Sequence, residues 1–547
     1  MNMKVRKMLA TGSLGLMSVL VLAGCGSSGQ SQSSNDTARI MSKEVISTAD
    51  SSLATDIVSA QAITNTMEGL YRYHGKKLEP AMATKVVRPT NNGLTYTFPL
   101  RHNVKWSNGD PVTAQDFVFA WRRTVNPKTK SQYAYIYEGI ANAKDITAGK
   151  KPVNSLGVKA LDKYTLQVNL EKPIPYFGPL MSADFFFPQD PKVVQKWGKK
   201  YGTNSKTLVS NGPYKLQNWS SVDNSWTQVK NKDYWNAKAV KVPKLKYQVV
   251  KDASTALNLY QAKKLDRVEL SGDTSKQMKG SKGYSVLKQN STVYLEMNQR
   301  KYPFFKNQKL RQAMSLAINR QQLTKKVLGN GTSAASSATA SNMTFNPTNK
   351  KQDFVAATAQ TGKANTKYDL AKAKELWRQG LAETGQKKIK FDLLGDDTDI
   401  AKQQSEFLQN QLEKLPGLKV NLNNVPYKTR ISRSASGDFD VVITMWNADF
   451  PDPINFLTLF TTGASYNSGK WSDPQYDNLV NQSMSQDANN ASARWQDMVA
   501  AQNILNEQQG VIPLYQNGQA FMTHDRLQHL DYGPSSLYNM VSLRIKK

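Results

Sequence analysis

Helix-like and strand-like spacings of apolar residues alternate along the chain with no fixed repeat period. The stretch 110–127 has apolar residues at helical spacing after a capping box between Thr113 and Asp116, and Pro127 is expected to end this helix. A longer amphipathic pattern over 307–331 predicts one long helix that ends at Gly329. The chain is therefore expected to be an α/β protein.

The segment 439–446 is a continuous apolar and β-branched run, the pattern of a strand buried on both faces, and 291–298 predicts another strand. A loop then leads to a helix expected at 452–460, with Asp452 as its N-cap. Open α/β sheets bind ligands at the carboxyl ends of their strands, which is where this loop places Asp449. From the pattern alone, Asp449 is equally compatible with a surface residue and with a ligand contact.

The N-terminal segment has the pattern of a signal peptide. Three basic residues precede an apolar run from Met8 to Ala23, which is shorter than the about 20 residues that span a bilayer. The run ends in Leu22–Cys25, which resembles a bacterial lipobox and contains the only cysteine of the chain. Lipidation of Cys25 is expected, and the alternative is an ordinary signal peptide with an incidental cysteine. The polar stretch after it predicts a flexible tether.

Charge distinguishes this chain more than its composition does. The net charge of +30 over 547 residues falls to +27 when the three basic residues of the signal segment are removed. Lys and Arg are spread along the whole length and form no dense arm, so the charge predicts a solvated face suited to an anionic cell envelope and no nucleic-acid partner.

Motifs that carry catalysis are incomplete. Ser285–Lys288 matches S-x-x-K, but the other motifs of that hydrolase class do not follow, and the four histidines have no metal-ligand spacing. We therefore expect no enzyme, no cofactor and no metal site.

Six blocks of sequence occur in the order of one known family. They are Leu22–Cys25, Lys105–Pro127, Lys150–Phe177, Ser210–Leu216, Tyr294–Arg320 and Trp446–Pro453. Together they resemble the oligopeptide-binding (OppA type) solute-binding proteins of ABC importers, family 5 of the extracellular solute-binding proteins. The resemblance implies a lipid-anchored receptor on the extracytoplasmic face of a bacterial membrane. Such a receptor captures oligopeptides and delivers them to the permease subunits of the transporter.

The fold implied by the resemblance is a two-lobed α/β clamp of the periplasmic-binding-protein type II, with hinge strands and an additional domain. The expected boundaries are a signal peptide at 1–24 and a tether at 25–39. Lobe I is expected at 40–70, 190–285 and 515–547, the additional domain at 71–189, and lobe II at 286–514. A monomer is expected.

The resemblance also implies a binding site. In the family, an aspartate in the motif matched by WNADF pairs with the α-ammonium group of the peptide, and it falls on Asp449. The three residues before it are expected to pair with the peptide backbone as a strand does: Trp446, Asn447 and Ala448. Contacts are also expected from Tyr133 and Tyr515.

Several alternatives stay open within and outside this class. Within 424–439 this chain has Ala, Ser and Ile at the positions where enteric members carry basic residues, and within 47–62 it lacks an acidic residue that those members place against the ligand. Peptide length and side-chain preference are therefore undetermined. A signalling-peptide, dipeptide or metal-chelate receptor is compatible with the family. A surface adhesin is compatible with the charge, and a cell-wall peptide hydrolase is the alternative that the motifs support least.

Overall fold

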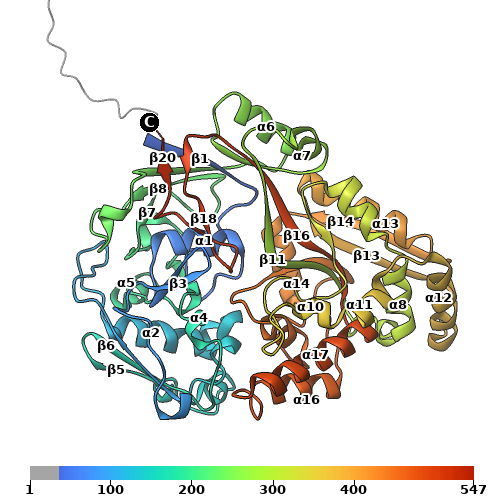
Figure 1. Cartoon of the computed structure of the whole chain (residues 1–547), viewed down its shortest axis with the longest axis horizontal. Coiled ribbons are helices and arrows are strands. Elements are labelled where there is room, and N and C mark those ends of the chain that lie inside the picture. The colour runs from blue at the N-terminus through green and yellow to red at the C-terminus, as the bar shows by residue number, and fades with distance from the viewer. Residues whose placement is uncertain (1–35, 547) are drawn as a thin grey trace, which may run out of the picture.

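The structure is a computed structural model that describes residues 36–546 (Figure 1). One large sheet organises it, with the path β14-β13-β15-β11-β16-β10-β1-β9-β8-β7 and the short β12 beside β16. Helices cover this sheet on both sides, so the α/β class and the two-lobed clamp are confirmed. The predicted signal peptide and Cys25 lie outside the described residues.

The first lobe contains one end of the sheet. Its strands are β1 (Thr37–Ser42), β7 (Tyr214–Gln217), β8 (Ser225–Lys230), β9 (Lys244–Val249) and β10 (Arg267–Leu270). Its helices are α1 (Ile57–Thr66), α5 (Pro191–Trp197), α6 (Ala253–Gln261) and α7 (Gly272–Met278). Because Thr37 already pairs with Lys244 of β9, residues 37–39 belong to the sheet and not to the expected tether.

The second lobe contains the other end of the sheet. Its strands are β13 (Ile389–Asp396), β14 (Leu418–Val425) and β15 (Val441–Asn447). The longer helices are α8 (Gln308–Leu316), α11 (Ala359–Thr366), α12 (Leu370–Thr384), α13 (Asp399–Leu412), α14 (Tyr427–Ser436), α16 (Pro474–Ser483) and α17 (Ala491–Gln508). The short elements are α9 (Arg320–Gln322), β12 (Ser333–Ala334), α10 (Phe354–Ala357) and α15 (Ile454–Leu457). None of the described helices is both long and apolar enough to cross a membrane.

Two long antiparallel strands, β11 (Tyr284–Met297) and β16 (Ile512–Thr523), run between the lobes (Figure 1). β16 pairs with β10 on one side and with β11 on the other. The pairing of β11 with β16 has an irregularity between Lys288 and Thr292, where the chain passes from one lobe to the other. Strand irregularities of this kind bend a sheet locally, which suits a hinge. The predicted strand at 291–298 is thus confirmed as the second half of β11.

A smaller unit lies beside the first lobe. It is built on α2 (Ala114–Val125) and the three-stranded sheet β4 (Thr95–Pro99), β6 (Thr165–Asn169) and β5 (Val158–Asp162). The hairpin β2 (Tyr71–His74) and β3 (Lys77–Pro80) and the helices α3 (Ala143–Thr147) and α4 (Phe177–Leu180) complete it. The capping box predicted at the start of α2 is present, with the Thr113 N–H donating to Asp116 Oδ2 at 2.7 Å. We call this unit the additional domain; its expected limits at 71–189 stay a prediction.

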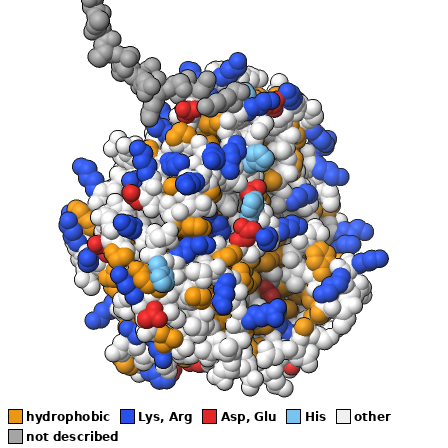
Figure 2. All heavy atoms as spheres, turned by 60° about the vertical axis from the view of Figure 1, so that its left-hand side comes forward, with side chains coloured by type: hydrophobic (Ala, Val, Ile, Leu, Met, Phe, Trp, Pro, Cys, Tyr) orange, Lys and Arg blue, Asp and Glu red, His pale blue; other side chains and the backbone are white. Residues whose placement is uncertain are grey.

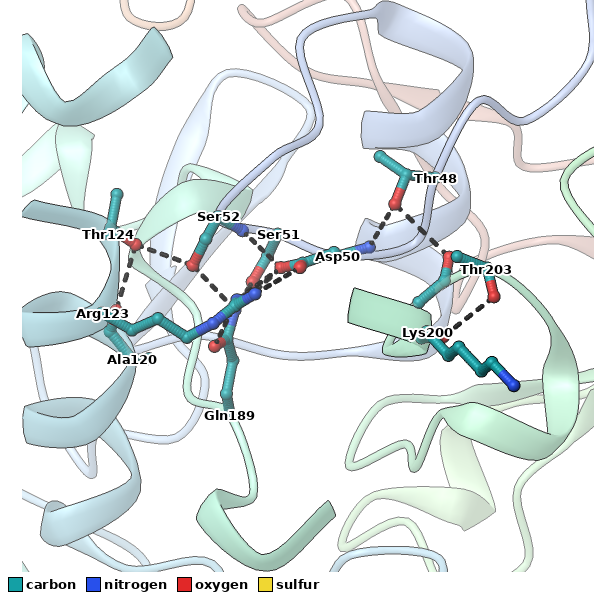
Figure 3. A network of polar contacts seen from close by, with 11 residues as sticks. Thr48, Asp50, Ser51, Ser52, Ala120, Arg123, Thr124, Gln189, Lys200 and Thr203 are labelled. Atoms are coloured by element: carbon teal, nitrogen blue, oxygen red, sulfur yellow. Dashed lines mark hydrogen bonds and ion pairs between the residues drawn. The ribbon is translucent and has the colours of Figure 1, made fainter. Parts of the chain in front are cut away.

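A buried polar network joins the additional domain to the first lobe (Figure 3). The Arg123 guanidinium on α2 donates to both carboxylate oxygens of Asp50, at 2.7 and 2.6 Å. Gln189 donates to the hydroxyls of Ser51 and Ser52, and Ser52 also contacts Thr124. Because these groups are mostly buried and bonded to one another, the two units are expected to move as one body.

The long helix predicted at 307–331 is wrong in one respect, because it is interrupted. α8 ends at Leu316, and a new turn begins at Arg320 after Asn319 caps it. The buried Arg320 guanidinium donates to the Ser315 and Ile318 carbonyl groups, which a continuous helix would use internally. The predicted end at Gly329 is confirmed, with the left-handed φ of 59° that favours glycine.

Charged side chains are scattered over the face of the molecule drawn in Figure 2. Figure 2 shows Lys and Arg scattered over the visible face, with fewer acidic groups between them. This agrees with the charge distribution expected from the sequence.

Candidate functional site

A closed cleft between the two lobes contains two adjacent chambers. The small chamber has a volume of about 150 Å³, and the large chamber about 360 Å³. The two share one wall, formed by Ile57, Tyr427, Arg430, Thr444, Met445 and Asn447. This wall includes the carboxyl half of β15, so the strand predicted from the apolar run passes along both chambers.

The loop after β15 places the Asp449 carboxylate in the wall of the small chamber. Its Oδ1 accepts a hydrogen bond from the Tyr133 hydroxyl at 3.2 Å, and its Oδ2 accepts one from Asn455 Nδ2 at 3.1 Å. The Asn455 Oδ1 accepts from the Asp449 N–H and from Trp446 Nε1, both at 3.0 Å. Tyr133 from the additional domain and Asn455 from the second lobe, itself held by Trp446, therefore fix the orientation of this carboxylate.

No basic side chain compensates Asp449 among the described residues. Burial raises the pKa of its carboxyl group to about 7, against the two hydrogen bonds from Asn455 and Tyr133. The single basic residue that lines the small chamber, Arg430, is 2.9 Å from the Asp396 carboxylate and is committed to it. A carboxylate held in a cavity without a cation is an energetic cost that a cationic ligand would remove.

One backbone edge of β15 is open to the cleft. On its other side β15 pairs with β11 from Val441 to Asn447, and the Ala448 N–H donates to the Asn290 carbonyl at 2.8 Å. Since the bonding direction alternates along an antiparallel strand, the peptide groups of Met445 and Asn447 point away from β11. β13 pairs with β15 only at Val441 and Val442, so among the described strands none covers this part of the edge.

The predicted site residues fall into three groups. Tyr133, Trp446, Asn447 and Asp449 line the small chamber together, which brings residues distant in sequence to one place. Tyr515 lines the large chamber, where its hydroxyl donates to Gln404 Oε1 at 2.9 Å. Ala448 lines neither chamber, because it is fully buried and its N–H is bonded to β11.

The sequence did not indicate two residues that line the small chamber, Met445 and Tyr466, or Asn455, which holds the Asp449 carboxylate. Met445 could have been found from the two-residue period of β15, which places it on the same side as Asn447. Asn455 is a buried polar residue in an apolar stretch, a pattern that signals a structural hydrogen bond. Tyr466 lies in an irregular loop and gave no sequence signal.

The expected role of Asp452 needs correction. Its Oδ1 does accept from the Ile454 N–H at 3.0 Å, but α15 begins only at Ile454 and runs for four residues. The same carboxylate forms a bidentate ion pair with the Arg494 guanidinium at 2.8 and 2.9 Å, in a buried position. Asp452 is therefore half of a buried ion pair and not merely a helix cap.

Aromatic rings close the cleft on the side of the additional domain. Tyr176 stacks on Phe450 with ring centres 4.5 Å apart. Tyr133 lies 5.8 Å from the Tyr466 ring and 6.5 Å from the Trp446 ring. One hydrophobic core also continues from the additional domain into 446–511. These contacts join the additional domain to the second lobe, as in a closed clamp.

Comparisons with known proteins agree with this arrangement. A dipeptide-binding protein of Lactococcus lactis is 37% identical over 489 residues, which is 87% of each chain. The peptide-bound OppA structure of Listeria monocytogenes is 37% identical, with 94% of this chain and all of that chain covered and a TM-score of 0.89. An unliganded open form of the murein tripeptide-binding protein MppA, 29% identical, covers 94% and 98% of the two chains with a TM-score of only 0.61.

The lower score against the open form agrees with a closed placement of the lobes, as the ring contacts across the cleft indicate. The family model of the bacterial extracellular solute-binding proteins, family 5, matches residues 77–468, which is more than half of the chain. The chain belongs to family 5 of the bacterial extracellular solute-binding proteins.

Proposed function

We propose that this protein captures oligopeptides by closure of its two lobes and delivers them to an ABC transporter for uptake. The observation that carries the proposal is the Asp449 carboxylate, oriented by Tyr133 and Asn455 and left without a cation in a closed cleft. The α-ammonium group of a peptide supplies the missing charge. Relatives named as dipeptide- and oligopeptide-binding proteins support this class of ligand.

The open edge of β15 gives the peptide a direction. With its N-terminus at Asp449, a peptide beside this strand must run back toward Met445, which is antiparallel to β15. The peptide groups of Met445 and Asn447 are then available for the backbone hydrogen bonds of an added strand. This path leads from the small chamber into the large one. Backbone bonds are the same for every sequence, so they suit a receptor of broad specificity.

The large chamber favours peptides longer than two residues. A dipeptide would occupy the small chamber and its border with β15, leaving the about 360 Å³ beyond it unfilled. Apolar and aromatic side chains line much of that chamber, among them Trp226, Tyr247, Phe521 and Met540. We therefore rank a dipeptide receptor below an oligopeptide receptor. A signalling-peptide receptor would use the same site and differ only in the number of peptides bound.

The membrane attachment is proposed from sequence alone. The lipobox at Leu22–Cys25 would give a lipid anchor at Cys25, so that the body stands above the extracytoplasmic face of the membrane and reaches the permease subunits. The charge of +27 leaves an adhesive role toward anionic polymers as a second activity, which would weaken steeply as salt rises. Membership of a solute-binding protein family supports a binding role for this chain.

Mass spectrometry of ligands released from the purified mature protein tests the proposal. We expect peptides of three or more residues with free N-termini. N-acetylated versions of the same peptides should bind much more weakly in calorimetry, because acetylation removes the charge that Asp449 needs. Equal affinity for the free and acetylated forms would contradict the proposed site, and the absence of any peptide binding would contradict the function.

A further inference from the structure

The small chamber is rich in carboxyl groups although the protein as a whole is basic. Four carboxylic side chains line it: Asp56, Asp184, Glu296 and Asp449. Its one basic lining residue, Arg430, is paired with Asp396, which is not one of the four. A single peptide ammonium group pairs with only one of these carboxyl groups, so the other three need separate explanations.

Two of the remaining carboxylates have partners within the protein. Asp56 caps α1, with its Oδ1 accepting from the N–H groups of Val58 at 3.1 Å and Ser59 at 2.9 Å. Glu296 accepts from the Gly469 N–H at 2.7 Å. Both are therefore part of the structure of the chamber wall.

Asp184 is distinguished by its neighbour Asp449, which acts on it electrostatically. It is 8% exposed and lines the chamber. It lies in the first turn of the 3₁₀ helix Asp184–Phe186, where the N–H groups of residues 184 and 185 stabilise its carboxylate. Burial, together with the nearby Asp449 carboxylate, raises the pKa of its carboxyl group to about 7. Among the described residues no side chain forms an ion pair with it or donates a hydrogen bond to it.

Asp184 and Asp449 are linked through two stacked aromatic residues, Phe185 and Tyr133. Phe185, the next residue in the chain, stacks on Tyr133 with ring centres 4.4 Å apart and an interplanar angle of 17°. Tyr133 in turn donates its hydroxyl hydrogen bond to Asp449. Asp184 thus belongs to the additional domain and Asp449 to the second lobe, and both face the same enclosed space.

We infer that the small chamber selects peptides whose first residue is basic, with Asp449 binding the α-ammonium group and Asp184 binding the cationic side chain of that residue. This inference rests on the proposed function, because it requires a peptide N-terminus in the small chamber. A lysine or arginine at the first position carries its two positive charges on one residue. The chamber offers two carboxyl groups without a basic partner, one from the additional domain and one from the second lobe, which matches such a residue in charge.

The test compares two peptides that differ only in charge. Lys-Ala-Ala-Ala and norleucine-Ala-Ala-Ala have similar side-chain length, and only the first has a cationic side chain. For the wild-type protein we expect calorimetry to give an affinity about thirty-fold or more higher for the lysine peptide, the lower end for a buried charge pair. In Asp184→Asn this preference should fall to a few-fold at most.

A matched variant shows whether the lysine preference depends on the carboxylate of Asp184 or on any carboxylate of the chamber. Asp56→Asn removes another carboxylate of the same chamber and keeps the cap of α1, since Asn caps a helix about as well as Asp. It should retain the preference for lysine, while Asp184→Asn should lose it. Thermal unfolding of each variant reports whether the fold is intact.

The outcomes distinguish the inference from the proposed function. Equal affinity of the wild-type protein for the two peptides overturns the inference and leaves the peptide receptor standing. A lysine preference that survives in Asp184→Asn also overturns it, because another group must then bind the side chain. Failure of both peptides and of a peptide mixture to bind the wild-type protein would overturn the proposed function together with the inference.

Discussion

Replacing Asp449 with asparagine tests the residue on which peptide capture depends. The change keeps the shape of the side chain and removes its charge. Asn455 cannot turn its amide to adapt, because its Oδ1 is held by both Trp446 Nε1 and the N–H of residue 449. The new amide oxygen must therefore face Asn455, and the new NH₂ group must face the Tyr133 hydroxyl and the chamber.

This orientation replaces an attraction with a repulsion. In the wild-type protein the Asp449 carboxylate lines the chamber, and its oxygen that accepts from Tyr133 is proposed to bind the cation. In the variant an NH₂ group occupies that place and directs its hydrogens at the peptide ammonium. Losing one partner of a buried charge pair costs about 2–5 kcal/mol, mostly as faster dissociation. At about 1.4 kcal/mol per tenfold, the affinity should fall by about thirty-fold to a few thousand-fold.

Calorimetry and stopped-flow dissociation with one free-amine peptide measure this loss. Asp452→Asn is unsuitable as the control, because it would break the buried pair with Arg494. Asp369→Asn is a better one: Asp369 caps α12 by accepting from the Lys372 N–H at 3.0 Å and lines neither chamber. This variant should bind like the wild type. If Asp449→Asn does so too, the ammonium assignment is refuted.

Four further results are expected. Arg123→Ala, which leaves Asp50 buried and unpaired, should lower the free energy of unfolding by about 3 kcal/mol in urea titrations; a loss under 1 kcal/mol would contradict the assigned importance of that pair. Tyr176→Ala removes the ring stacked on Phe450. It should speed peptide dissociation several-fold in stopped-flow measurements, with the association rate nearly unchanged. An unchanged dissociation rate would show that the ring contact does not hold the closed form. Burial raises the pKa values of three chamber carboxyl groups, Asp184, Glu296 and Asp449, to about 7, so the fold favours their protonated forms. The ligand-free protein should therefore melt at a higher temperature at pH 5.5 than at pH 8. Asp449→Asn should reduce that difference in melting temperature. Cys25→Ala should release a peptide-binding protein into the medium, and a variant that stays with membranes after a high-salt wash would show that lipidation is not the anchor.

The elements that follow from local patterns were predicted well. α2 has its capping box, β15 follows its apolar run, and Gly329 ends its helical segment. These features depend on a few neighbouring residues, whose propensities and hydrogen bonds are readable in sequence. The interruption of the helix before Arg320 could not be predicted from the sequence, because it depends on which carbonyl groups accept hydrogen bonds from the buried Arg320 guanidinium.

The site was predicted only in part, for a similar reason. Asp449 could be placed at a strand end, and the family resemblance added Tyr133 from a segment more than three hundred residues away. Three features of the site depend on tertiary contacts. They are the lack of a basic partner for Asp449, the pairing of Asp452 with Arg494, and the exposure of Asp184 to the same chamber. No spacing along the chain encodes them, so they became visible only in the fold.

The position of β16 in the sheet has a consequence for how the chain folds. β16 is the last long strand in sequence, yet it lies in the middle of the sheet, between β11 and β10. Until β16 is inserted, each half of the sheet ends in an unpaired strand, an edge that can pair with another chain. Completion also requires contacts far apart in sequence, such as Arg267 with Thr523, which form slowly. The folding protein is therefore most exposed to aggregation in the interval before β16 is inserted, and a holding chaperone would be most effective then.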